Sequence, residues 1–396
     1  MICEVCNSKK IKKIIDLGKQ PLCDDLIKIG SKKKSKKFET QIYFCLNCYT
    51  ALHKTQINPK ILFPKNYHYR AKFTKDVLRG MQNLVNETIN VVKKKKLRVL
   101  DIGCNDGSLL NFFKKKGFKT FGIEPTNASK EAQKNHVIMN SYFNSLTAKK
   151  FLLKYGYPDI ITFTNVFAHI KDLKNLLKSL KILLKSKTIL IIENHYLKSV
   201  IKNNQFDTFY HEHPRTYSLK SFIHVAKFLN LEIFKVQFPK RYGGNIRVYL
   251  GNKKKFKFLK KHLKGEQQVI KQIFTLKHKV KKWKKNKTLQ LKKMNQKFGP
   301  LPAKAFPGRA SILINLLGLT KNQISRVYEQ NNSKKIGHYI PGTRIPIGND
   351  IDLKKINSKL PLINFSWHIT REIRKYLIKN KIKNKVIDIV SAKDFL

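Results

Sequence analysis

The stretch LRVLDIGCNDGSLLNFFKKKG (97–117) decides the fold. A short apolar run ends in an acidic residue and a glycine turn, and a run with helical spacing follows, which predicts a strand, a tight turn and a helix. Asp101, Gly103 and Gly107 stand in this turn, where a ligand can approach the backbone at the carboxyl end of the strand. A glycine-rich turn is, by itself, a weak indication of a cofactor site.

A second strand with an acidic end strengthens this interpretation. The segment FKTFGIE (118–124) reads as a strand and ends in Glu124. A carboxylate roughly 20 residues after the glycine turn is placed to hydrogen-bond the ribose of an adenosine-type cofactor. The glycines do not follow the G-x-G-x-x-G pattern, and a single turn at Gly103 with an acidic Asp101 suits a sulfonium cofactor better than a pyrophosphate.

Strands and helices alternate around this unit. We expect a helix over 74–93, a strand over 159–165, a helix over 171–185 and a strand over 188–194. This order predicts an α/β fold with a doubly wound, mainly parallel sheet. A chain of 396 residues is too long for one compact core and suits two or three domains.

Two C-x-x-C pairs near the start predict a metal site. Their members are Cys3, Cys6, Cys45 and Cys48. Each pair can present two thiolates to one tetrahedral Zn²⁺, and four protein ligands close the site, which favours a structural metal. The gap between the pairs exceeds that of a zinc ribbon, so a folded segment lies between them. Cys23 and Cys104 have no partner at ligand spacing.

The segment FDTFYHEHPRTYSL (206–219) places a tyrosine, two histidines and a glutamate at consecutive positions. It could form a metal site, an acid/base cluster or a polar loop. The metal interpretation is the weaker one, because no cysteine or aspartate ligand is adjacent. Histidine is the default side chain for proton abstraction near neutral pH. Local chemistry alone does not separate His211 from His213 as the base.

Several motifs resemble the sugar C-methyltransferases of deoxysugar biosynthesis. VLDIGCNDGSLL (99–110), GIEP (122–125) and NVFAHI (165–170) are similar to the S-adenosylmethionine-binding motifs of that family. The other similar segments, in chain order, are DLGKQPL (16–22), YHEH (210–213), GGNIRVYL (243–250), LPAKAFPGRASILINLLGL (301–319) and PGTRIPI (341–347). The resemblance covers nearly the whole chain in the right order.

The resemblance implies a domain plan and an activity. It implies a zinc-binding module at 1–70, a methyltransferase domain at 71–253, and a helical connector with a smaller Rossmann-like domain at 254–396. The expected reaction moves a methyl group from S-adenosylmethionine to a carbon next to the keto group of a nucleotide-linked deoxysugar. A ketone makes the neighbouring C–H acidic enough for a side-chain base to remove its proton.

The resemblance also assigns residues. It makes His213 the general base, supported by Tyr210 and Glu212. The expected cofactor contacts are Asp101, Gly103, Cys104, Asn105, Gly107, Glu124 and Asn165. The expected substrate contacts are Tyr67, Tyr69, His211, Asn245 and Arg247. From the residues alone, the tyrosines of the aromatic run 61–70 could equally be packing residues.

The C-terminal third departs from the family pattern. Residues 254–297 predict a long lysine-rich helix or helix pair. The run LKKMNQKFGPLPAK (291–304) lacks the apolar strand expected before the next motif, which puts ligand contacts at 299–309 in doubt. Strands are expected over 325–331 and 385–390, with a strand-to-helix passage over 363–377.

The net charge of +59 raises the question of a polyanionic partner. Only 11 of the 83 basic residues are arginine, and the lysines are spread along the chain, which favours a compositional bias over a nucleic-acid surface. A nucleic-acid methyltransferase and a non-catalytic binding protein are the competing hypotheses. The sequence shows no signal leader and no apolar membrane-spanning window, so we expect a cytoplasmic protein with reduced cysteines.

Overall fold

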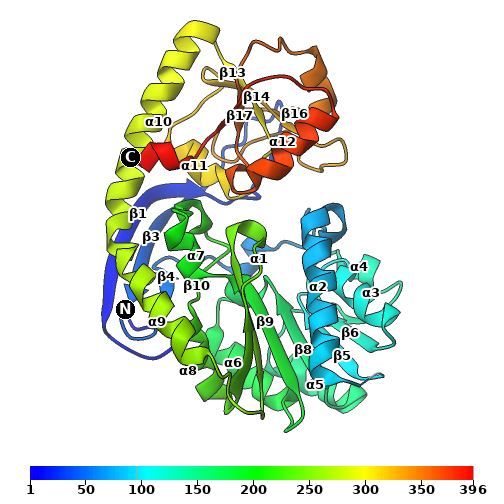
Figure 1. Cartoon of the computed structure of the whole chain (residues 1–396). Coiled ribbons are helices and arrows are strands. Elements are labelled where there is room, and N and C mark those ends of the chain that lie inside the picture. The colour runs from blue at the N-terminus through cyan, green and yellow to red at the C-terminus, as the bar shows by residue number, and fades with distance from the viewer. Residues whose placement is uncertain (95, 396) are drawn as a thin grey trace.

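A seven-stranded sheet, central in the chain, forms the lower half of the computed structural model, which describes residues 1–94 and 96–395 (Figure 1). Its strands, in spatial order, are β11 (Glu232–Gln237), β12 (Asn245–Gly251), β9 (Ile189–His195), β8 (Ile160–Thr164), β5 (Arg98–Ile102), β6 (Lys119–Ile123) and β7 (Val137–Met139). The five strands from β9 to β7 pair in parallel, while β12 pairs antiparallel with β9 and with β11. The predicted mainly parallel sheet is confirmed.

Helices cover both faces of this sheet, because its strands are apolar on both sides. One face packs against α2 (Lys75–Val92) and α3 (Ser108–Lys115), whose Leu84 and Phe113 contact the face that carries Val99. The other face packs against α5 (Ser145–Tyr155), α6 (Leu173–Leu183) and α8 (Leu219–Leu229), on the side of Leu100. The doubly wound arrangement leaves the carboxyl ends of the parallel strands free to form a site.

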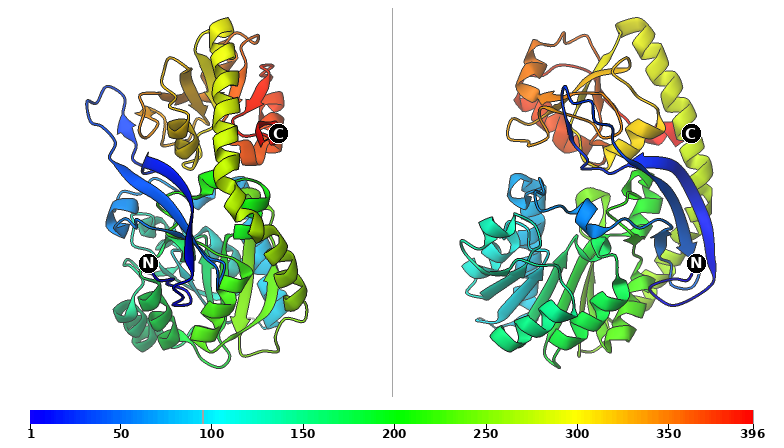
Figure 2. Two further views of the ribbon diagram at one scale, coloured as in Figure 1. Left: turned by 90° about the vertical axis from the view of Figure 1, so that its left-hand side faces the viewer. Right: turned by 180° about the vertical axis from the view of Figure 1, so that it is seen from behind.

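The N-terminal segment forms a separate four-stranded sheet. Its strands, in spatial order, are β1 (Ile11–Pro21), β3 (Lys37–Cys45), β4 (Ala51–His53) and β10 (Arg215–Thr216). Only Pro214 separates the last strand from the YHEH motif, so this sheet holds the motif against the N-terminal segment. A short ladder between β2 (Ile27–Lys28) and β15 (His338–Tyr339) connects the same segment to the C-terminal region (Figure 2).

The C-terminal region contains a five-stranded parallel sheet. Its strands, in spatial order, are β16 (Ile347–Asn349), β14 (Ile324–Glu329), β13 (Leu301–Lys304), β17 (Leu362–Asn364) and β18 (Val386–Asp388), flanked by α11 (Ala310–Leu316) and α12 (Thr370–Lys379). The expectation that 291–304 lacks a strand is therefore wrong, since β13 is central and buried. Pro302 is tolerated because the pairing with β14 is irregular between Leu301 and Pro302.

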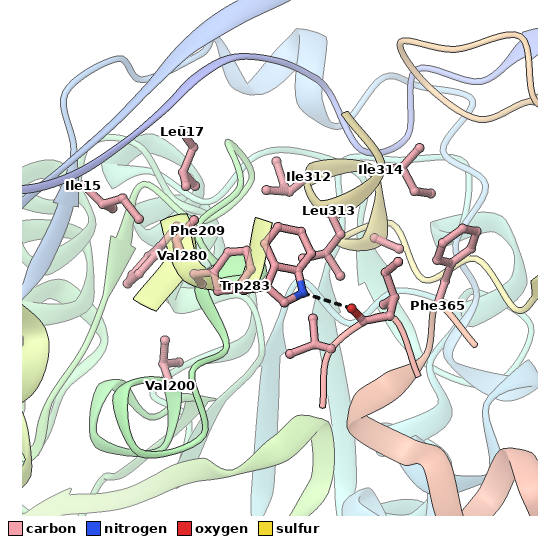
Figure 3. Close-up of a cluster of buried hydrophobic side chains, with 14 of the residues drawn as sticks. Ile15, Leu17, Val200, Phe209, Val280, Trp283, Ile312, Leu313, Ile314 and Phe365 are labelled. Atoms are coloured by element: carbon pink, nitrogen blue, oxygen red, sulfur yellow. Dashed lines mark hydrogen bonds between the residues drawn. The ribbon is translucent and has the colours of Figure 1, made fainter. Parts of the chain in front are cut away.

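The connector binds the parts of the chain together. It consists of α9 (Leu259–Ile270) and α10 (Leu276–Phe298), which run along one side of the molecule (Figure 1). Trp283 of α10 is fully buried, and its indole N–H donates a hydrogen bond of 2.9 Å to the carbonyl of Ile389 (Figure 3). The same apolar cluster contains Ile15 of β1, Phe206 and Leu313. One continuous core thus fixes the N-terminal, central and C-terminal regions relative to one another.

No helix in the part of the chain that the structure describes is both long and apolar enough to cross a membrane.

Candidate active site

A cleft of about 1950 Å³ opens between the central sheet and the C-terminal region. The N-terminal segment contributes Tyr67 and Tyr69 to its wall, the central region contributes the ends of the parallel strands, and the C-terminal region contributes Arg309. Of the predicted site residues outside the zinc site, those lining the cleft are Tyr67, Tyr69, Asp101, Gly103, Cys104, Asn105, Glu124, Asn165, Tyr210, Glu212 and His213. Segments that are far apart in the sequence therefore meet in one cavity.

The predicted cofactor residues form one corner of this cleft. Gly103 has a φ of +73°, and a Cβ atom there would lie 2.6 Å from the side chain of Val166, so only glycine fits. Asn105 and Asn165 also have a left-handed backbone, which brings the loops after β5 and β8 close together. Gly107 does not line the cleft; it precedes α3 and packs against the next segment at Ala132.

Two carboxyl groups lie at this corner in different environments. Glu124 accepts a hydrogen bond from the backbone N–H of Asn105 at 3.0 Å and from the N–H and hydroxyl of Thr126 at 2.9 and 2.6 Å. Asp101 accepts from the hydroxyl of Thr162 at 2.6 Å, and burial raises the pKa of Asp101 to about 7. A carboxylate at the end of the second strand, next to a backbone without a Cβ atom, fits the ribose of an adenosine-type cofactor.

Tyr210 and His213 form a hydrogen-bonded pair in the cleft. The Tyr210 hydroxyl lies 3.1 Å from Nε2 of His213, and Nδ1 of His213 lies 3.3 Å from the carbonyl oxygen of Thr208. A carbonyl can only accept, so the proton is assigned to Nδ1, and Nε2 accepts from the tyrosine. Burial, together with His169 and His195, holds the pKa of His213 well below its ordinary value. The imidazole is therefore neutral, which is the form that a general base needs.

The Glu212 carboxyl group lies apart from this pair. Within the described residues, its Oε2 is buried without a hydrogen-bond partner, and no hydrogen bond joins the carboxyl to His213. Burial and the nearby Asp24 raise the pKa of Glu212 to about 8, so it is mainly a carboxylic acid at pH 7. Its backbone carbonyl accepts a hydrogen bond of 2.5 Å from Nδ1 of His169. Thr208, rather than the Glu212 carboxyl, orients the His213 ring.

The structure separates the two histidines of the motif. His211 does not line the cleft but points toward the N-terminal sheet. Its Nε2 lies 3.2 Å from the hydroxyl of Thr40 and 3.3 Å from the carbonyl of Glu39, and its ring packs against His53. The expected substrate contact of His211 is therefore not seen, and its position suits a structural part.

Asn245 and Arg247 likewise lie behind the cleft wall. Both are fully buried on β12, and both bind the buried carboxylate of Glu193, at 3.0 and 2.7 Å. Burial alone would raise the pKa of Glu193, but Arg241 and Arg247 outweigh it and hold that pKa below its ordinary value. Asn245 also donates to the side chain of Asn165 at 3.2 Å. Neither residue lines the cleft, so the expected substrate contacts of Asn245 and Arg247 are not seen.

Four further residues line the cleft but were not predicted as site residues from the sequence: His169, His195, Tyr242 and Arg309. His169 stands inside the NVFAHI segment, and His195 follows the predicted strand 188–194, so a search for titratable residues at strand ends would have found both. Tyr242 has a φ of +53°, a strained conformation for a bulky residue. Arg309 enters the cleft from the C-terminal region, which the sequence alone cannot place.

The four cysteines of the two C-x-x-C pairs converge on one point. Their sulfur atoms all lie within 4.8 Å of one another, with 3.4 Å between Cys3 and Cys48 and 3.6 Å between Cys6 and Cys45. A tetrahedral zinc with Zn–S bonds of about 2.3 Å has ligand sulfurs about 3.8 Å apart, so these thiols fit the metal. These contacts are too long for disulfides.

The two cysteine turns share one backbone geometry. The residue after each pair, Asn7 or Tyr49, has a left-handed backbone. Its N–H donates to the carbonyl of the first cysteine of the pair, at 2.8 Å for Asn7 and 2.9 Å for Tyr49. Each turn thereby directs both of its sulfur atoms to the same side, as a metal site requires.

Comparison with known families identifies the parts of the chain. A family model described as "Putative zinc binding domain" matches residues 3–63, one described as "Methyltransferase domain" matches 69–236, and one described as "C-methyltransferase C-terminal domain" matches 240–386. The chain therefore combines, in this order, a putative zinc-binding domain, a methyltransferase domain and a C-methyltransferase C-terminal domain. Zinc and S-adenosylmethionine, the two expected cofactors, correspond to its first two domains.

Individual proteins are similar over part of the chain. The C-methyltransferase NovU of Streptomyces niveus is 25% identical over 253 residues, which are 62% of this chain and 60% of NovU. The match thus spans less than two thirds of that relative. Among solved structures, the plantazolicin methyltransferase BpumL with SAH is 15% identical, with a TM-score of 0.36 over 45% of this chain and 84% of its own. The magnesium protoporphyrin IX methyltransferase of Synechocystis PCC 6803 with SAM is 14% identical, with a TM-score of 0.35 over 44% and 79%.

Replacing Glu124 by Ala should weaken S-adenosylmethionine binding by about 1–3 kcal/mol, the usual effect of losing a charged hydrogen-bond partner. Titration calorimetry measures this directly. Glu87→Ala is the matched control, because Glu87 pairs with Lys235 on the surface and does not line the cleft. Equal affinities for the parent protein and the Glu124 variant would refute the assignment of Glu124 to the ribose.

Proposed function

We propose that the protein is an S-adenosylmethionine-dependent C-methyltransferase that methylates the carbon next to the keto group of a nucleotide-linked deoxysugar. One observation carries the proposal: the neutral His213, paired with Tyr210, lines the same cleft as the cofactor corner at Gly103 and Glu124. A base beside a methyl-donor site is what C-methylation next to a ketone needs, because a C–H bond is not itself a nucleophile.

In this proposal His213 removes the proton next to the ketone. The electron pair of the broken C–H bond forms the C=C bond of an enolate, and the carbonyl π pair moves to oxygen. Tyr210 donates to the base nitrogen in the resting state and is placed to relay the proton. When bound, S-adenosylmethionine supplies an electrophilic methyl group to the enolate carbon and retains the electron pair of the broken S–C bond. The proton on His213 then leaves to solvent.

The C-terminal region offers the cleft a positive charge that suits an anionic substrate group. Arg309 reaches the cleft from the C-terminal region, and two of its nitrogens bind the buried carboxylate of Asp207 at 2.5 and 2.9 Å. Its Nη1 is buried and has no hydrogen-bond partner among the described residues. Arg309 thus places a positive charge at the cleft wall, which suits an anionic group of the substrate such as a diphosphate.

The charge of the cleft supports a small substrate over a nucleic-acid polymer. Among the residues that the structure describes, nine acidic residues line the cleft, against 24 in the sequence, but only 12 lysines and arginines do, against 83 in the sequence. The cleft is therefore much less basic than the chain as a whole. A groove that follows a polyanion would show the opposite enrichment.

A substrate panel tests the proposal. Purified protein is incubated with radiolabelled S-adenosylmethionine and dTDP-, GDP- or UDP-linked keto-deoxysugars, and each keto-sugar is paired with the matching nucleotide sugar that has a hydroxyl group in place of the ketone. We expect methyl transfer to at least one keto-sugar and to none of its alcohol counterparts. Transfer that does not depend on the ketone, or transfer only to nucleic acid, would overturn the proposal.

A further inference from the structure

His195 lies beside His213 in the cleft, although His213 and Tyr210 account for the proposed chemistry without it. It is the last residue of β9 and lines the cleft. Its ring centre is 5.0 Å from that of His213 and 5.6 Å from that of Tyr242. A small ligand that contacts Nε2 of His213 therefore also lies within reach of His195.

The ring nitrogens of His195 differ from those of its neighbours in having no protein partner. Nδ1 of His169 donates a hydrogen bond to the carbonyl of Glu212. The two ring nitrogens of His213 are hydrogen-bonded to the carbonyl of Thr208 and the hydroxyl of Tyr210. Nδ1 of His195 is inaccessible to solvent and has no hydrogen-bond partner in the described part of the chain. Nε2 also has no hydrogen-bond partner among the described residues but is accessible to solvent, so it is the nitrogen that a ligand in the cleft can reach.

The surroundings of His195 keep its ring neutral. Burial, with smaller contributions from the positive charge of Arg309, from His169 and from Arg241, lowers the pKa of His195 to about 3. A neutral imidazole still has one N–H donor, and it can polarise a carbonyl without adding a positive charge beside the base. An imidazolium at the same place would repel a protonated His213.

The hydroxyl of Tyr210 is engaged by Nε2 of His213, which leaves the keto oxygen of the substrate without an assigned donor. We propose that His195 is a catalytic residue that donates a hydrogen bond to the keto oxygen as it becomes the enolate oxygen. This role rests on the proposed function, because it needs a ketone beside the carbon that loses its proton. The proton moves from the substrate carbon to His213, and His195 keeps its own.

Exchange of the substrate's α-hydrogen with D₂O isolates this step from methyl transfer. The probe is the keto-sugar of the panel that the parent protein methylates fastest. Removing one preorganised donor to a developing oxyanion lowers turnover by about 10²–10³-fold, so His195→Phe should slow exchange by that factor and leave KM nearly unchanged. His195→Gln, which retains an N–H donor, should recover part of the rate. S-adenosylmethionine affinity and the thermal midpoint report on folding in both variants.

A matched substitution is available outside the cleft. His224→Phe on α8 replaces a partly exposed histidine that does not line the cleft, and it should exchange deuterium at the parent rate. If the parent exchanges and a folded His195→Phe exchanges equally fast, His195 has no catalytic role. The proposed role is also overturned if His195→Phe changes only KM, or if His195→Gln recovers none of the lost exchange rate. If the parent itself exchanges no hydrogen, the proposed function fails, and this role fails with it.

Discussion

Replacing His213 by Asn should lower the rate of methyl transfer by about 10²–10⁴-fold, the usual contribution of a general base, while S-adenosylmethionine affinity stays at the parent value. Asparagine keeps a polar group of similar size but cannot take up a proton near neutral pH. The cofactor corner should not change, because the contacts of Glu124 are made by Asn105 and Thr126 and not by the YHEH motif. Transfer of labelled methyl groups measures the rate, and calorimetry measures the affinity.

The motif supplies its own control. His211→Asn changes a histidine two positions away that faces Thr40 and Glu39 instead of the cleft, so its effect should be much smaller. Deuterium exchange at the substrate's α-carbon should stop in the His213 variant and continue in the His211 variant. The reverse pattern would show that His211 is the base. Unchanged exchange in both variants would remove the YHEH motif from the acid/base chemistry altogether.

The sequence predicted the central sheet well because each signal there is local. The apolar run 98–102, the glycine turn after it and the acidic end of the next strand all lie within one strand–helix–strand unit. The cysteine spacing was equally informative, since two C-x-x-C pairs suit a tetrahedral metal whatever lies between them. These features depend on neighbours in the chain, which a sequence displays directly.

Features that depend on distant segments were missed or misplaced. Asn245 and Arg247 share one face of β12, but α2 covers that face, and Arg247 donates to Asn83 of that helix at 3.0 Å. Their polar side chains therefore bind the buried carboxylate of Glu193. In the sequence, Glu193 stands only as one residue at the end of an apolar run. The sequence could not predict which of His211 and His213 faces the cleft. Both lie in a loop, where no helical or strand periodicity assigns a side chain to one face.

The zinc domain and the acid/base motif are physically joined, which was also invisible in the sequence. One residue, Pro214, separates the motif from β10, which pairs with β4 of the N-terminal sheet, and the N–H of His53 donates to the carbonyl of Pro214 at 2.9 Å. The fully buried Arg215 of β10 forms an ion pair with Glu4, which stands between two of the cysteines. These contacts link the four-cysteine cluster to the loop that carries His213.

Replacing Cys45 by Ser should release the zinc and lower both stability and methyl transfer, because a closed thiolate site contributes directly to folding. Apparent binding free energies of about 10–16 kcal/mol in zinc-finger peptides at pH 7 set the scale of what a lost ligand can remove. Loss of the metal should also free Glu4 from its position beside Arg215, so the loop that carries His213 should lose this support. Metal analysis by mass spectrometry and a thermal melt measure the two effects.

Cys23→Ser is the control for metal content, since Cys23 lies outside the four-sulfur cluster and its sulfur is hydrogen-bonded to the hydroxyl of Ser311 at 3.2 Å. Parent protein that contains no zinc near one equivalent, or a Cys45 variant that retains it, would show that the four cysteines are not a metal site.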